Sequence, residues 1–248
     1  MIVKIMDRKT KKIIDRGLYF NRTLNHIQLG DSIGYGECFA WRKHDIREVD
    51  YEYEGERPEK WSNDLYVDTL NYAAKAHGKQ QVKFRGYSYL AHIASVAQEI
   101  MAVDKGEFDF DDSIQMALLH DVLEDTTISF EQLAAEIGCK VARGVLALTK
   151  DKTLDKKTQM VDSLGRIKNE PIEVAMVKMA DRITNLQEPP KEWSINKRFR
   201  YAKEAEVILE SLSYANDQLA ERLERKIFEY KLWYVENIEG NISMDKEV

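Results

Sequence analysis

The spacing of hydrophobic residues changes character near residue 60. Before that point, apolar residues occur in short β-rich runs separated by glycines, and five of the twelve glycines fall there. The runs are Met1–Ile5, Leu18–Phe20, Ile33–Trp41 and Val49–Tyr53. We therefore predict a few strands in hairpins over residues 1–57. The acidic stretch Glu48–Glu56 is expected to be an exposed linker, and His26 and His44 are expected to be surface histidines.

From Ser62 onward the apolar residues recur three and four positions apart, which is typical of amphipathic helices. The first two stripes are Tyr66, Leu70, Ala73, Ala74, His77 and Tyr89, Ile93, Val96, Ala97, Ile100, with the basic loop Gly78–Tyr87 between them. Later helices are expected to begin at Pro171 and to cover Ala202–Leu212 and Leu219–Leu232. The pattern predicts a mainly α fold: a helical bundle over residues 62–236, with a small β-rich extension before it and a polar tail, 239–248, after it.

Local end signals support the helices in the middle of the chain. Ser129 and Gln132 form a capping-box pattern, and Gly138 is a suitable stop for the helix that follows them. Acidic residues at 111 and 112, with Ser113, are a favourable helix start. The segment Thr149–Thr158 is expected to be a loop whose lysines, including Lys156 and Lys157, are either solvated or in contact with phosphate.

Composition describes an ordinary chain of 248 residues with 44% hydrophobic and 32% charged residues. It contains no apolar run near the ~18 residues of a membrane helix and no signal peptide, so a cytoplasmic location without a membrane partner is expected. A net charge of -6 argues against a general nucleic-acid binder. Cys38 and Cys139 lack metal-type spacing and are expected to be reduced, buried thiols.

The most unusual polar stretch is Ser113–Thr126, which carries His120, Asp121, Glu124 and Asp125 directly after apolar residues. In a helix, residues four apart share a face, so these four side chains would crowd one ridge. A bound cation is the simplest way to stabilise such a crowd. The alternative is a helix end with solvated acids.

Two further polar residues lie beside apolar stripes on other predicted helices. His92 precedes Ile93, and Asp181 adjoins the stripe that runs to Ile183. A lone histidine in such a place is commonly a core residue. Together with His120 and Asp121, however, they form a mixed nitrogen and oxygen shell that suits manganese or iron better than thiolate-rich zinc sites do.

Six segments in order resemble the HD-domain metal-dependent phosphohydrolases, most closely the small stand-alone alarmone hydrolases of the RelA/SpoT type. They are Ala-His-Gly-Lys-Gln at 76–80, Tyr-Leu-Ala-His at 89–92, Ala-Leu-Leu-His-Asp-Val-Leu-Glu-Asp-Thr at 117–126, Leu-Thr-Lys-Asp-Lys-Thr at 148–153, Val-Lys-Met-Ala-Asp-Arg-Ile-Thr-Asn-Leu at 177–186, and Glu-Trp-Ser at 192–194 leading to Tyr201. The resemblance covers about residues 62–215.

That resemblance implies a reaction and roles for named residues. It implies hydrolysis of the 3′-pyrophosphate of guanosine tetra- or pentaphosphate to GDP or GTP, with Mn²⁺, or another divalent ion, as cofactor. The implied metal ligands are His92, His120, Asp121 and Asp181, and the implied catalytic acids are Glu124 and Asp125. The expected substrate-binding residues are Lys83, Arg85, Lys150, Lys152, Asn185, Lys197, Arg198 and Tyr201.

Departures from the family pattern leave alternatives open. Val82 stands where the family has an arginine that stacks on guanine, and Ser88 and Ile93 replace two prolines. Arg85 is a candidate substitute for the missing arginine. The substrate could therefore be another 3′- or 2′-phosphorylated nucleotide. A third hypothesis is a non-catalytic nucleotide-binding module whose β-rich segment docks a partner protein.

We expect a stand-alone enzyme without a synthetase region; an oligomer is compatible with the sequence.

Overall fold

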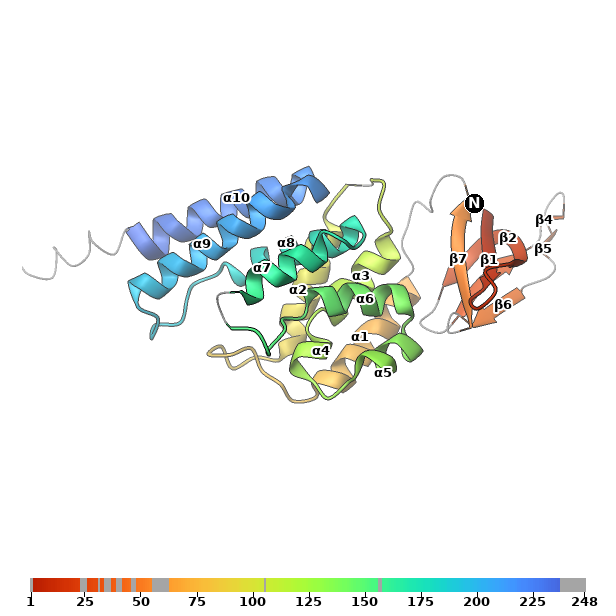
Figure 1. Ribbon diagram of the computed structural model, residues 1–248, viewed down its shortest axis with the longest axis horizontal. Helices are drawn as coiled ribbons and strands as arrows, with labels where there is room; N and C mark the ends of the chain where they lie inside the picture. The colour runs from red at the N-terminus through yellow and green to blue at the C-terminus, as the bar shows by residue number, and fades with distance from the viewer. Residues whose placement is uncertain are drawn as a thin grey trace, which may run out of the picture.

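Apolar residues that alternate along the first strands bury one face of a five-stranded antiparallel sheet in the order β6-β3-β2-β1-β7. A computed structural model describes residues 2–22, 26–30, 32–33, 37–38, 42–45, 48–54, 63–104, 106–155 and 158–236 (Figure 1). The strands are β1 (Ile2–Asp7), β2 (Ile13–Arg22), β3 (His26–Gly30), β6 (Arg42–Asp45) and β7 (Val49–Glu54), and a separate pair is formed by β4 (Ser32–Ile33) and β5 (Glu37–Cys38). The buried side chains on this face are Val3, Ile5, Ile27, Leu29 and Val49.

Several details of the sheet correct the sequence prediction. Strand β3 was not predicted. The predicted β-rich run Val49–Tyr53 is confirmed as part of strand β7, which pairs along its length with β1, so these residues are not the exposed linker that was expected over Glu48–Glu56. His44 is not a free surface histidine, because its Nε2 lies 2.5 Å from Asp15 Oδ2 and its side chain is 20% exposed. The side chains of His26 and Cys38 lie outside the described residues.

Helices and the loops that join them account for the rest of the described chain. They are α1 (Asn63–His77), α2 (Tyr89–Met101), α3 (Phe110–Leu119), α4 (Val122–Asp125), α5 (Phe130–Glu136), α6 (Cys139–Leu148), α7 (Gln159–Ile167), α8 (Ile172–Asn185), α9 (Ile195–Leu212) and α10 (Asp217–Lys231), with short helical turns at Ser213–Ala215 and Leu232–Glu236. The mainly α class with a β-rich N-terminal part is thus confirmed. The domain boundaries at residues 57, 62 and 236 stay predictions, because residues 55–62 and 237–248 lie outside the described residues.

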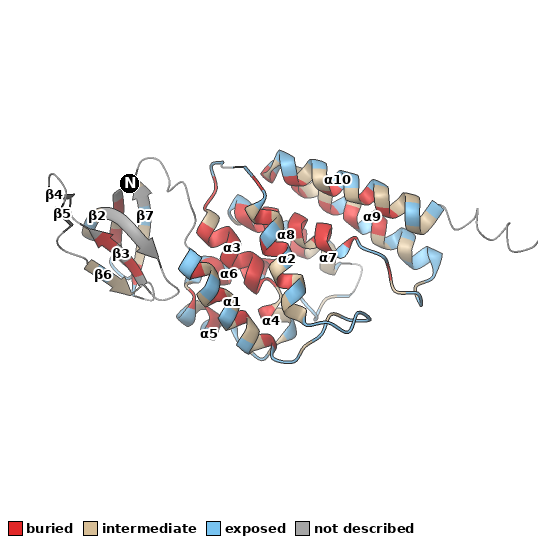
Figure 2. Ribbon diagram, turned by 180° about the vertical axis from the view of Figure 1, so that it is seen from behind, coloured by how far each residue is buried: buried red, intermediate tan, exposed pale blue. Residues whose placement is uncertain are grey.

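Helix α3 lies at the centre of the helical part. All of its residues from Asp111 to Leu119 are buried, and it packs against α1, α2, α6 and α8 (Figure 2). Helices α9 and α10 pack against each other and against α8 on the side away from α1 (Figure 1). The end of α3, the first turn of α2 and the C-terminal part of α8 are therefore brought to one place by core packing.

The structure breaks the helix that was expected over Ser113–Thr126. Helix α3 ends at Leu119, and Asp121 leaves the helical region with φ -105° and ψ 1°. Its carbonyl oxygen accepts hydrogen bonds from the backbone of Glu124, at 3.1 Å, and Asp125, at 2.9 Å, and so starts α4. The histidine and aspartate therefore occupy a corner between two helices, not one continuous ridge.

Other local predictions have mixed outcomes. The capping box at Ser129 and Gln132 is present. Helix α3 is capped by Asp109, two residues before the predicted start, and Pro171 caps α8 from just outside it. Helix α7 was not predicted, and α9 begins seven residues earlier than expected. Cys139 is free but exposed, so the prediction of a buried thiol is wrong there. Lys156 and Lys157 lie outside the described residues.

Candidate metal centre

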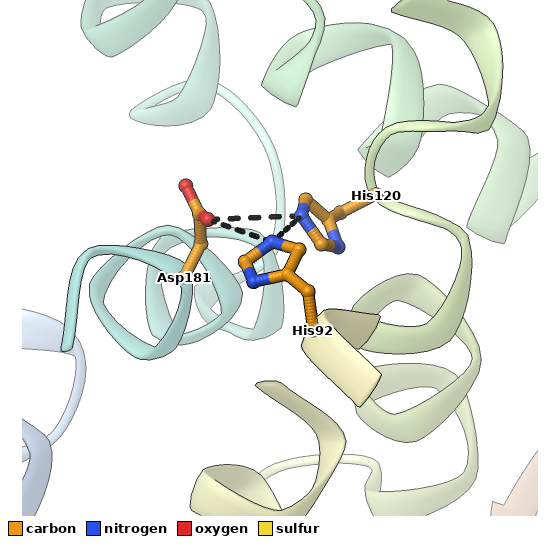
Figure 3. A group of neighbouring side chains, drawn as sticks. All are labelled: His92, His120 and Asp181. Carbon is orange, nitrogen blue, oxygen red and sulfur yellow. Dashed lines mark hydrogen bonds and ion pairs between the residues drawn. The ribbon is translucent and has the colours of Figure 1, made fainter. Parts of the chain in front are cut away.

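Three helical elements each contribute one side chain to a tight polar cluster. His92 comes from α2, His120 from the end of α3 and Asp181 from α8 (Figure 3). The two Nε2 atoms lie 3.2 Å apart, and Asp181 Oδ1 lies 3.5 Å from His92 Nε2 and 3.7 Å from His120 Nε2. The three side chains are 10%, 4% and 14% exposed. Two imidazole nitrogens and a carboxylate oxygen that converge in a buried place form the donor set of a divalent transition metal.

The orientation of His120 is fixed from behind the cluster. Its Nδ1 lies 2.8 Å from the carbonyl oxygen of Ala117, so Nδ1 donates there and Nε2 faces His92 and Asp181. Burial disfavours the charged form of His120, but Asp121 and Asp181 outweigh burial and raise its pKa to about 9. A divalent cation that binds to this cluster would therefore compete with the proton on His120.

Asp121 lies beside this cluster. Its Oδ2 is 3.0 Å from His120 Nε2 and 3.9 Å from His92 Nε2, and the hydroxyl of Tyr89 donates a hydrogen bond to the same oxygen. Burial would raise the pKa of Asp121, but His120 outweighs it and lowers the pKa. Of the four predicted ligands, the structure thus brings three into mutual contact and keeps Asp121 within reach of both imidazoles.

Asp181 has two further partners that lie on its own helix. Asn185 Nδ2 donates to Oδ1 at 2.5 Å, and Lys178 Nζ approaches Oδ2 at 3.5 Å. Burial would raise the pKa of Asp181, but Lys178 and the two imidazoles hold it well below its usual range. Sequence reasoning missed Lys178, although its spacing of three residues from Asp181 on a helix is the pattern that could have identified it.

The two predicted catalytic acids follow the corner at His120 and Asp121. Glu124 Oε2 accepts a hydrogen bond from the backbone of Lys150 at 3.3 Å, and Asp125 Oδ2 accepts one from Gln80 Nε2 at 2.9 Å. Both acids line a cavity of about 470 Å³ that is also lined by His92, His120 and Asp181, the side chains of the candidate metal site. A phosphorylated ligand in this cavity would meet the cluster and both acids together.

The predicted substrate residues differ in where they lie relative to this cavity. Five of the eight line it, namely Lys83, Arg85, Lys150, Asn185 and Tyr201. The other three are outside its lining. Lys152 donates to the carbonyl oxygen of Glu124 at 2.8 Å, and the Nζ of Lys197 lies 4.1 Å from the ring centre of Trp193. The Nε of Arg198 is buried and has no hydrogen-bond partner in the part of the chain that the structure describes. Lys178 joins the lining cations.

Aromatic residues form one wall that sequence reasoning identified only in part. Tyr201 lines the cavity, and its ring centre lies 5.2 Å from that of Trp193 and 6.0 Å from that of Tyr230, both of which also line it. Burial raises the pKa of Tyr201, and that of Tyr230 to about 12, so both stay protonated donors. Trp193 was part of the recognised motif, but the contact of Tyr201 with Tyr230 on α10 depends on packing between helices that are distant in the sequence.

A hairpin-like loop between α1 and α2 forms another wall of the cavity. Val82 N donates to the carbonyl oxygen of Tyr87 at 2.9 Å, and Gln81 pairs with Ser88. Phe84 takes a φ of 67°, in the left-handed region, at the tip. Arg85 donates to the carbonyl oxygen of Glu188 at 2.6 Å, so its guanidinium reaches the residues that follow α8. Val82 offers this wall an apolar side chain.

Comparison with known proteins gives consistent matches over the helical part. The HD domain family matches residues 69–218. Guanosine-3′,5′-bis(diphosphate) 3′-pyrophosphohydrolase MESH1 of Danio rerio is 31% identical over 173 residues, which are 68% of this chain and 95% of that protein. The MESH1 protein of Homo sapiens is 30% identical, over 63% of this chain and 89% of its own length.

Longer relatives and a solved structure agree with these matches. A GTP pyrophosphokinase, rsh, of Brucella ovis is 30% identical over 71% of this chain but only 24% of its own length. A solved structure of a metazoan orthologue of SpoT that hydrolyses ppGpp superposes with a TM-score of 0.60 and 26% identity, covering 68% of this chain and 97% of the other.

Proposed function

This chain belongs to the HD domain family, and from that premise we propose that it is a metal-dependent hydrolase of the 3′-pyrophosphate of guanosine tetra- or pentaphosphate. One observation carries the proposal. A buried cluster of two imidazoles and a carboxylate shares a cavity with Glu124 and Asp125, and cationic side chains line the same cavity. The relatives that match most of this chain carry the same activity in their names.

The donor set fits a divalent metal. His92, His120 and Asp181 would hold it, with Asp121 as the fourth protein ligand, and manganese is the ion that we propose. Such an ion lowers the pKa of bound water and polarises a phosphoryl oxygen. The fit rests on the convergence of three nearly buried donors within 4.8 Å of one another, each contributed by a different helical element.

The acids and cations of the chain account for the remaining steps. In the reaction, a new P–O bond forms to the water oxygen while the bond between phosphorus and the ribose 3′ oxygen breaks. We assign Glu124 and Asp125 to the two proton transfers. One of them accepts a proton from the attacking water, and the other supplies a proton to the leaving 3′ oxygen. Lys83, Lys150 and Lys178 balance the charge of the phosphates within an acidic protein.

The experiment uses the full chain with manganese and a panel of nucleotides. We expect GDP and pyrophosphate from guanosine tetraphosphate, and no turnover with bound metal would contradict the proposal. Glu124→Gln is expected to abolish turnover and to retain metal, because the amide keeps an oxygen for the backbone hydrogen bond from Lys150. Glu136→Gln, an exposed change on α5, is the matched control.

Two alternatives have distinct outcomes in the same experiment. Hydrolysis of another 3′- or 2′-phosphorylated nucleotide, favoured by Val82, would appear as a different preferred substrate in the panel. Nucleotide binding without turnover by the unaltered protein would favour a binding module that docks a partner through the sheet.

No described helix is long and apolar enough to cross a bilayer. A cytoplasmic location and the absence of a nucleic-acid partner stay predictions.

A further inference from the structure

A chain of hydrogen bonds, called the line below, runs from Asp125 through Gln80 to His77 at the end of α1, away from the candidate metal site. Gln80 Nε2 donates to Asp125 Oδ2 at 2.9 Å, and Gln80 Oε1 lies 2.8 Å from Nδ1 of His77. His77 is the last residue of α1 and is 6% exposed. Neither His77 nor Gln80 contacts the metal cluster directly in any hydrogen bond among the described residues, so the line serves the acid rather than the metal.

The chemistry of the three groups sets the direction of the line. A carboxylate only accepts hydrogen bonds, so the amide nitrogen of Gln80 must face Asp125. The amide oxygen then faces His77, and Nδ1 of His77 must carry the hydrogen. A neutral imidazole has one N–H, which leaves Nε2 as a bare acceptor. Among the described residues, no hydrogen-bond partner faces the buried Nε2 of His77, so no contact requires a hydrogen on that nitrogen.

The main chain holds the middle of this line in place. Gln80 N donates to the carbonyl oxygen of His77, and Tyr89 N donates to the carbonyl oxygen of Gln80, both at 3.0 Å. The ring of His77 also packs against that of Tyr89, with centres 4.9 Å apart. The side chain of Gln80 is therefore presented from a backbone fixed between α1 and α2, although Gln80 itself borders the cavity.

We propose that Gln80 is a positioning residue for Asp125, and that His77 acts only through Gln80, as the Nδ1–H tautomer that fixes which way the amide faces. By holding Oδ2, the amide restricts the rotamer of an acid whose placement the reaction requires. The catalytic half of this proposal rests on the proposed function. The tautomer of His77 does not, because it follows from the hydrogen bonds alone.

Kinetics of variants test the positioning role. Gln80→Met keeps the length of the side chain and removes both hydrogen bonds, and we expect kcat to fall about 10- to 100-fold, as misplacement of a reacting group does. The Michaelis constant and the manganese affinity should stay within about twofold of the unaltered protein, since no metal ligand is touched. Gln98→Met, the same change at an exposed position of α2, is the matched control.

Variants of His77 test whether it acts through Gln80. His77→Leu should lower kcat, and the double variant with Gln80→Met should be no slower than Gln80→Met alone, because both changes break one line. His77→Asn should restore most of the rate, since its amide places a donor near the former Nδ1. An unchanged kcat for Gln80→Met, or additive losses in the double variant, would overturn the positioning role.

A spectroscopic measurement separates this proposal from the proposed function. Long-range ¹H–¹⁵N spectra of the metal-free protein, recorded where imidazoles are neutral, should show an Nδ1–H tautomer that is distinct from His120, whose Nδ1 donates to Ala117, and that disappears in His77→Asn. An Nε2–H tautomer at His77 would overturn the orientation of the line. If the unaltered protein hydrolysed no guanosine tetraphosphate, the proposed function would fail, and this measurement would still decide how Gln80 faces Asp125.

Discussion

Tyr89 donates its hydroxyl hydrogen to the carboxylate oxygen of Asp121 that lies 3.0 Å from His120 Nε2. One oxygen thus faces a predicted metal ligand on one side and a buried phenol on the other. Burial raises the pKa of Tyr89, and Asp121 raises it further, so the phenol stays a donor throughout the working pH range. Tyr89 is therefore placed to orient Asp121 toward the proposed metal, without being one of the proposed ligands.

The first prediction concerns that phenol. Tyr89→Phe keeps the ring contacts with His77 and His92 but removes the hydrogen bond to Asp121. We expect manganese affinity to fall about 10- to 100-fold, the usual cost of losing such an outer partner. Calorimetric titration of the metal-free protein measures it, and an unchanged affinity would show that Asp121 needs no such support.

The second prediction concerns Asp181. Asp181→Asn removes one negative donor and leaves the buried ammonium group of Lys178 without its counter-charge. We expect manganese to be absent from the purified variant by elemental analysis and turnover to be lost. We also expect the metal-free variant to be less stable by about 3 kcal/mol, the cost of breaking a buried ion pair.

A surface pair provides the control for that change. Asp162 forms an ion pair with Arg166 at 2.8 Å, four residues further along α7, and the two side chains are 34% and 33% exposed. Asp162→Asn should change the free energy of unfolding by less than about 0.5 kcal/mol and leave metal content intact. Full metal occupancy in Asp181→Asn would mean that the ion is held elsewhere.

The third prediction concerns the nucleobase. Val82 lines the cavity with an apolar side chain that can neither donate a hydrogen bond nor stack as a guanidinium does. Without the arginine contact to guanine, whose loss costs about 1–3 kcal/mol, little remains to distinguish the two bases at this position. We therefore expect the unaltered protein to prefer guanosine over adenosine tetraphosphate by less than about tenfold in kcat/KM, a ratio equivalent to about 1.4 kcal/mol. Val82→Arg should increase the preference for guanine, and a strong preference before the change would assign base recognition to Arg85 or another residue.

The fourth prediction concerns pH and the sheet. Burial raises the pKa of Asp15, but hydrogen bonds from Arg42 and His44 outweigh it and lower the pKa below 3.8. A lowered folded pKa adds stability above pH 3.8, and this contribution is lost as the pH falls through the folded value. Asp15→Asn should therefore lower the Tm at neutral pH, and the difference should shrink as the pH falls through the lowered pKa of Asp15 and its carboxyl becomes protonated in the folded protein. A constant difference across this range would show that charge is not the cause.

The fold could be predicted where neighbouring residues determine it. The capping box at Ser129 and Gln132 is present because both partners lie within one helical turn, and the apolar stripes of α1 and α2 lie near their predicted places. The break after Leu119 could not be predicted in this way. Residues 113–126 fit one helix by their sequence pattern, but the chain turns at Asp121 and α4 packs against α1 and α6, which the local sequence does not encode.

The sequence by itself determined which residues are the candidates for the chemistry. The types and order of His92, His120, Asp121, Glu124, Asp125 and Asp181 indicate a metal-dependent phosphohydrolase before any contact is known. Only the tertiary structure decided how they cooperate: which three donors converge, that Tyr89 holds Asp121, that Gln80 holds Asp125, and that Lys197 and Arg198 lie outside the cavity lining. The reason is physical, because periodicity and capping act over a few residues, whereas these contacts join segments brought together by burial of a shared core.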